Sequence, residues 1–141
     1  MTPDPRFTTL LRADAALCLA CGLPGLVAPG WLAGFLLPSQ SQLFGFPMGT
    51  VMLELGILLT VYAGLLLAVS HRAALQRPVA AVSAIADAGW VIGTLALLIA
   101  FGGSFSLWGG VALLVVALDT GLMGLWKLRS LRTASPPLAT A

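Results

Sequence analysis

Four acidic residues are the side chains of this sequence with the clearest potential for chemistry. They fall one in each of four long apolar stretches: Asp14, Glu54, Asp87 and Asp119. A carboxylate within such a stretch is costly unless it faces protein, water or a partner, so these acids are candidates for a proton-linked site or a polar ligand pocket. They also have a structural explanation, in which a hydroxyl, Tyr62, a backbone group or Arg12 satisfies each acid and fixes the register of its helix.

The predicted depth of each acid in the membrane bears on the choice between the functional and the structural explanation. Counting from the predicted helix ends at about 1.5 Å per residue places Asp87, Asp119 and Tyr62 at a similar level, in a polar layer in the inner half of the bundle. For Asp87 and Asp119 both explanations stay open, whereas Asp14 and Glu54 lie nearer the surfaces, which favours the structural one. The predicted ligand or proton site consists of Asp87, Asp119, Tyr62, Asp14 and the deeply placed Trp90.

The elements that must position these acids are four predicted membrane-spanning helices, over residues 9–28, 49–70, 79–101 and 107–128. The third contains Asp87 as its only ionisable residue, and its length suffices to cross a hydrocarbon core of roughly 30 Å. Apolar residues make up 59% of the chain and charged residues 9%, well below the soluble average of about one quarter charged. We therefore predict an all-α membrane protein, a single domain built as a four-transmembrane-helix bundle.

The connecting segments are short. Residues 1–8 are expected to form an aqueous tail, with Thr8 or Thr9 capping the first helix. Residues 31–37 are too short to cross and begin with Trp31, which predicts a short interfacial helix after the first span. Residues 38–47 read as an uncharged loop, residues 71–78 as a short basic linker between antiparallel neighbouring helices, and residues 129–141 as a disordered tail.

The cations predict the orientation. Arg6 and Arg12 precede the first span, and Arg72 and Arg77 join the second to the third. The remaining three follow the fourth span: Lys127, Arg129 and Arg132. By the positive-inside rule both termini are cytoplasmic, in a cell inner (plasma) membrane. The cations form no basic stripe, which excludes a nucleic-acid partner.

Helical periodicity assigns the faces. In the third span one side carries Ala80, Ser83, Ala84, Asp87 and Thr94. In the fourth span one side carries Trp108, Ala112, Asp119 and Trp126. Small residues allow close helix contact, and the predicted packing positions are Gly56, Gly64, Gly89, Gly93, Gly110 and Gly121. One seam is expected to pack within the chain and the other against a protein partner or a second copy.

Cys18 and Cys21 form a CxxC in the first span. This pattern in a four-helix membrane protein resembles the quinone-linked thiol oxidoreductases of the DsbB and vitamin K epoxide reductase type, and the resemblance implies a redox role for the pair. The alternative is that both are small polarizable core residues. His71 is the only histidine, so we predict no metal site and no cofactor.

Two short motifs, LRADAAL in the first span and PGWLAGFL after it, resemble those of small bacterial four-helix inner-membrane proteins that are broadly DoxX-like. That resemblance implies a layout but no reaction. The acid of the first span and the Trp of the third are similar to those of small multidrug transporters, which implies proton-coupled export.

Three functions follow from these features. The first is a non-enzymatic accessory or assembly subunit of a larger membrane complex, because short loops leave little soluble surface for recognition. The second is a small proton-coupled transporter or lipophilic-ligand binder that uses Asp87, Asp119 and Tyr62. The third is a thiol oxidoreductase that uses Cys18 and Cys21.

Overall fold

The computed structural model describes residues 2–39, 42, 43 and 45–133. Its elements, in chain order, are α1 (Pro5–Val27), α2 (Pro29–Leu36), β1 (Gln42–Leu43), β2 (Phe46–Pro47), α3 (Met48–Ser70), α4 (Ala73–Phe101), the 3-10 turn η1 (Gly102–Ser104) and α5 (Leu107–Thr133). Apart from the small antiparallel pairing of β1 with β2, the regular elements of the described chain are all helices. Four helices, α1, α3, α4 and α5, are long and apolar enough to cross a membrane. The predicted all-α class is therefore confirmed.

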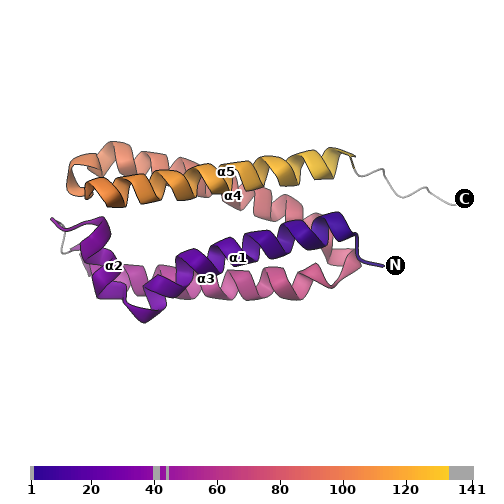
Figure 1. Cartoon of the computed structure of the whole chain (residues 1–141), viewed down its shortest axis with the longest axis horizontal. Helices are drawn as coiled ribbons and strands as arrows, with labels where there is room; N and C mark the ends of the chain where they lie inside the picture. The colour runs from indigo at the N-terminus through magenta and orange to yellow at the C-terminus, as the bar shows by residue number, and fades with distance from the viewer. Residues whose placement is uncertain (1, 40–41, 44, 134–141) are drawn as a thin grey trace, which may run out of the picture.

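The long helices associate as two pairs. Helix α1 packs against α3, and α4 packs against α5, as Figure 1 shows. Helices α3 and α4 are joined directly through His71 and Arg72, yet they contact each other far less than they contact their pair partners. The start of α1, the α3–α4 link and the end of α5 lie at one end of the molecule, and α2 lies at the other (Figure 1).

Glycines set the close contact between α1 and α3. A Cβ added at Gly25 would lie 2.6 Å from the Met52 carbonyl oxygen, and one added at Gly56 would lie 2.8 Å from the Gly22 carbonyl oxygen. Gly56, one of the predicted packing positions, therefore lies at the close contact between α1 and α3. Backbone atoms occupy the space on both sides, so no side chain can retreat to make room.

The other predicted packing glycines lie differently. A Cβ at Gly121 would make an ordinary contact with Val91, at 3.6 Å. At the remaining four it would meet no described atom of this chain within 4 Å: Gly64, Gly89, Gly93 and Gly110. These four make no close helix contact within the described chain, and their role against a partner stays a prediction.

Helix α2 is held against the start of α5. Ser106 donates its backbone N–H to the Leu36 carbonyl oxygen at 2.9 Å and its hydroxyl to the Phe35 carbonyl oxygen at 2.5 Å. The Ser106 hydroxyl also accepts the backbone N–H of Gly109 at 2.8 Å, which caps α5. Helix α2 spans Pro29–Leu36 rather than residues 31–37, because Pro29 occupies its first turn.

The ends of several helices differ from the predicted ones. Helix α1 begins at Pro5, not in residues 8–9, because the Asp4 carboxylate accepts the Arg6 N–H at 2.8 Å and caps it. Helix α5 continues to Thr133, so residues 129–133 are helical rather than part of a disordered tail; residues 134–141 lie outside the described residues. The loop expected over residues 38–47 contains β1 and β2, and its residues 40, 41 and 44 are likewise outside them.

The linker expected over residues 71–78 is mostly helix, because α4 begins at Ala73. The buried side chain of Gln76 holds this first part of α4 in place. Its amide nitrogen donates to Thr8 Oγ1 at 2.8 Å and to the Ser70 carbonyl oxygen at 2.9 Å, and its oxygen accepts the Asp4 N–H at 2.9 Å. One side chain thus joins the beginnings of α1 and α4 to the end of α3.

Candidate functional site

A fully buried lysine lies among the helices, in the last two turns of α5. Lys127 Nζ contacts Asp14 Oδ2 at 2.5 Å and Asp87 Oδ2 at 2.6 Å, and it donates to Ser83 Oγ at 2.5 Å. The Ser83 hydroxyl in turn donates to Asp14 Oδ2 at 2.9 Å. Lys127 is 0% exposed, Asp14 2% and Asp87 5%. We call Asp14, Ser83, Asp87 and Lys127 the charged centre.

Three helices from both helical pairs supply the charged centre. Asp14 comes from α1, Ser83 and Asp87 from successive turns of α4, and Lys127 from α5. Helix α5 can approach α4 at this level because Gly124 has no side chain. A Cβ added at Gly124 would lie 3.1 Å from Asp87 Cβ. The centre therefore joins the α1–α3 pair to the α4–α5 pair through one cation.

The ion pairs satisfy Lys127 but leave an imbalance of charge. An ammonium group has three N–H donors, and those of Lys127 are directed to Asp14, Ser83 and Asp87. With all three groups ionised, two carboxylates face one ammonium, so the centre carries one excess negative charge. Such a charge acts strongly on its surroundings, because a buried site screens it less than water does.

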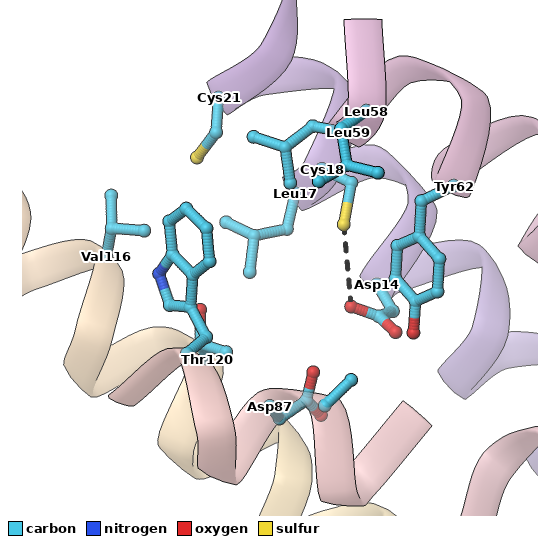
Figure 2. Close-up of a pocket in the computed structure, with 12 residues that line it drawn as sticks. Asp14, Leu17, Cys18, Cys21, Leu58, Leu59, Tyr62, Asp87, Val116 and Thr120 are labelled. Carbon is cyan, nitrogen blue, oxygen red and sulfur yellow. Dashed lines mark hydrogen bonds between the residues drawn. The ribbon is translucent and has the colours of Figure 1, made fainter. Parts of the chain in front are cut away.

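A cavity of about 220 Å³ lies next to the charged centre, between the two helical pairs. Side chains of α1, α3, α4 and α5 line it: Asp14, Leu17, Cys18, Cys21, Leu58, Leu59, Tyr62, Ala86, Asp87, Trp90, Val116 and Thr120. Figure 2 shows the carboxyl groups of Asp14 and Asp87 at one side of this space, and mostly apolar side chains, among them Leu17, Leu59 and Val116, around the rest. The cavity is therefore apolar along most of its wall and charged at one end.

Tyr62 and Cys18 adjoin the charged end. The Tyr62 hydroxyl is buried and has no hydrogen-bond partner within the described chain, although it points toward Asp14 in Figure 2. Ser83 lies near it but gives its own proton to Asp14. Cys18 Sγ lies 3.9 Å from Asp14 Oδ1. A buried hydroxyl without a partner is costly, so it marks a position where a bound polar group would gain a hydrogen bond.

The structure brings together four of the five predicted site residues. Asp14, Tyr62, Asp87 and Trp90 all line the cavity. Asp119 does not join this layer: its side chain lies on the exposed surface of α5, because the buried side of α5 carries other residues. Those residues are Gly109, Ala117, Thr120, Gly124 and Lys127. Glu54 is also exposed, on α3.

Sequence reasoning missed Lys127 and the role of Ser83. Lys127 was grouped with the cations that follow the fourth span, whereas it is fully buried and α5 extends beyond it. One available signal was the row Ala117, Thr120, Gly124 and Lys127, whose helical spacing places small residues and the lysine on one face. Among the described residues Arg12 pairs with no acid, and its guanidinium lies 3.4 Å from His71 Nε2.

The cysteines remain separate thiols. Cys18 is buried, Cys21 is half-buried, and both are free within the described structure. The same described residues contain no group of three or more histidine, cysteine or acidic side chains arranged to hold a metal ion. A redox role for the pair stays a prediction.

Comparisons with protein-family models, with curated proteins and with solved structures found no match. The DoxX-like resemblance of the sequence motifs therefore stays a prediction. The candidate site is defined by its own geometry alone.

Proposed function

We propose that the chain is a multi-pass membrane protein that binds a small lipophilic ligand in the cavity between its two helical pairs. One observation carries the proposal: an apolar cavity ends on the buried charged centre and on the unpartnered Tyr62 hydroxyl. Ligand sites in proteins combine mostly apolar walls with a few convergent polar groups in this way.

Stability alone is a weak reason for such a centre. Replacing a buried ion cluster by well-packed apolar side chains is often neutral or stabilising. Apolar side chains in place of Asp14, Asp87 and Lys127 could therefore hold the helices together as well as the charged ones do. Ionisable side chains inside membrane helices are candidates for function for the same reason. The cavity beside the centre supports a function in which a ligand meets it.

We place the charged centre in the cytoplasmic half of the membrane. Six cations lie on the segments at the end of the molecule where α1 begins and α5 ends: Arg6, Arg12, Arg72, Arg77, Arg129 and Arg132. Lys127 is left out of these six because its side chain is fully buried. The positive-inside rule then supports cytoplasmic termini.

Quenching of Trp90 fluorescence tests ligand binding directly. A variant in which Trp31, Trp108 and Trp126 are Phe keeps Trp90 as its only tryptophan, and 4-bromobenzyl alcohol quenches an indole that it contacts. In lipid nanodiscs we expect saturable quenching. Ala86→Phe, which fills the cavity, should abolish the saturable part, whereas the matched Ala88→Phe, on the same helix but outside the cavity lining, should preserve it. Quenching that rises linearly and equally in both variants would reflect partition into lipid and would refute the proposal.

A second function, that of an accessory subunit, is favoured by the outer surface of α4. Gly89 and Gly93 are exposed there, and space is open beside both, so a partner helix could approach closely. In a mild detergent extract, Gly93→Leu should then reduce the mass of the assembly that contains the chain, measured by light scattering after size exclusion. Ala88→Leu, on a different side of α4, is the control. An unchanged mass for Gly93→Leu would exclude this surface as the contact.

A further inference from the structure

We infer that the cavity selects a small lipophilic cation, such as a protonated amine or a quaternary ammonium group on an aromatic or aliphatic body. The inference rests on the proposed function, because it names the chemical class of the ligand for the same cavity. Three observations lead to it, and they concern the donors, the charge and the walls of the site.

The donors of the charged centre are already used. Lys127 directs its N–H groups to Asp14, Ser83 and Asp87, and Ser83 gives its proton to Asp14. A carboxylate or phosphate ligand would need such donors and would find none free at the centre. The Tyr62 hydroxyl is a remaining donor, but it can equally accept a hydrogen bond.

The charge of the centre favours a positive ligand. Asp14 and Asp87 both line the cavity, and the single ammonium of Lys127 faces both carboxylates, so with both acids ionised one negative charge is left uncompensated. Both carboxylates are almost fully covered, so their attraction acts through the low-dielectric interior and does not require direct contact. An anion in the same cavity would be repelled by the excess charge, and a neutral molecule would gain nothing from it.

The side chains that line the cavity also suit a lipophilic cation. Trp90 and Tyr62 offer aromatic rings, and the faces of such rings attract cations. Leu17, Leu58 and Val116 supply the apolar surface that a lipophilic body needs. A strongly hydrated inorganic cation would find few polar ligands here, whereas an organic cation carries apolar groups of its own that suit apolar surroundings.

A series of isosteric probes separates these possibilities in the nanodisc assay with Trp90 as the only tryptophan. The probes are 4-bromobenzylamine, 4-bromobenzyl trimethylammonium, 4-bromobenzyl alcohol and 4-bromobenzoate, each corrected for its partition into nanodiscs without protein. Both cations should bind at least tenfold more tightly than the alcohol, and benzoate should bind most weakly. If the alcohol saturates with the same affinity as the amine, or if benzoate binds best, the cation inference fails while ligand binding stands. If no probe saturates, the proposed function itself fails.

Asp87→Asn provides the decisive variant. It leaves Lys127 paired with Asp14 and removes one carboxylate charge from the centre, so the affinity for both cations should fall at least tenfold relative to the affinity for the alcohol. Circular dichroism of the variant, compared with that of the unaltered protein, checks that it is folded. The control is Glu54→Gln, which removes an exposed membrane-level carboxylate from α3 and should change no affinity. Equal losses for the cations and the alcohol in Asp87→Asn would overturn the inference.

Discussion

Lys127→Met is expected to destabilise the folded protein by about 3–5 kcal/mol, because it leaves the carboxylates of Asp14 and Asp87 buried without a counter-charge. Methionine keeps the unbranched shape of the side chain, so the loss reports on charge rather than on volume. The free energy of unfolding can be measured by circular dichroism during titration with SDS in mixed micelles. Arg129→Met, an exposed position two residues further along α5, should have a small effect.

Lys127→Met should destabilise the protein much less when Asp14 and Asp87 are replaced by Asn in the same variant. The triple variant Asp14→Asn, Asp87→Asn and Lys127→Met has no buried charge, so we expect it to recover most of the lost stability. Recovery would show that the acids and the lysine act as one unit, whose couplings a mutant cycle can measure. A triple variant as unstable as Lys127→Met alone would contradict the charge explanation and indicate that Lys127 acts mainly by packing.

Gly56→Leu is expected to cost about 3 kcal/mol or more, because the added side chain has to force apart the backbones of α1 and α3. A Cβ alone would already lie 2.9 Å from Leu26 N and 2.8 Å from the Gly22 carbonyl oxygen. Neither atom can rotate away as a side chain would. Because α1 and α3 form the most extensive helix pair, the whole wall of the cavity that carries Asp14 and Tyr62 should move with them.

Gly64→Leu is the matched control for this prediction. Gly64 lies two turns further along α3, on its exposed surface, and no described atom lies within 4 Å of an added Cβ. This substitution should leave the SDS unfolding midpoint almost unchanged. If Gly56→Leu unfolds at the same SDS concentration as Gly64→Leu, then α1 and α3 do not depend on the close approach at Gly56.

Helix α4 shows how much periodicity can predict. The side predicted to carry Asp87 was Ala80, Ser83, Ala84, Asp87 and Thr94, and these are the buried residues of α4 together with Gln76. The prediction succeeded because small and polar residues gather on one side of α4, while the large aliphatic ones lie elsewhere. Gln76 was missed because Pro78 was expected to precede the helix rather than lie within it.

Helix α5 shows the limit of the same reasoning. The inward-facing side of α5 was predicted to be the one that carries Asp119, on the assumption that an acid must turn inward. In the structure the Asp119 side chain is exposed. A helix with lipid on one side and protein on the other carries apolar residues all round, so periodicity distinguishes its faces poorly. The row of small residues that ends at Lys127 was the better guide.

The sequence by itself determined four helices of membrane-spanning length and apolarity and the buried side of α4, because these depend on composition and local spacing. Only the tertiary structure decided which acids turn inward and that Lys127 compensates them. Lys127 and Asp14 are 113 residues apart, and nothing local to either one indicates the other. Their ion pair depends on how the α4–α5 pair docks against α1, and the close approach of α5 to α4 at Gly124 brings Lys127 to Asp87.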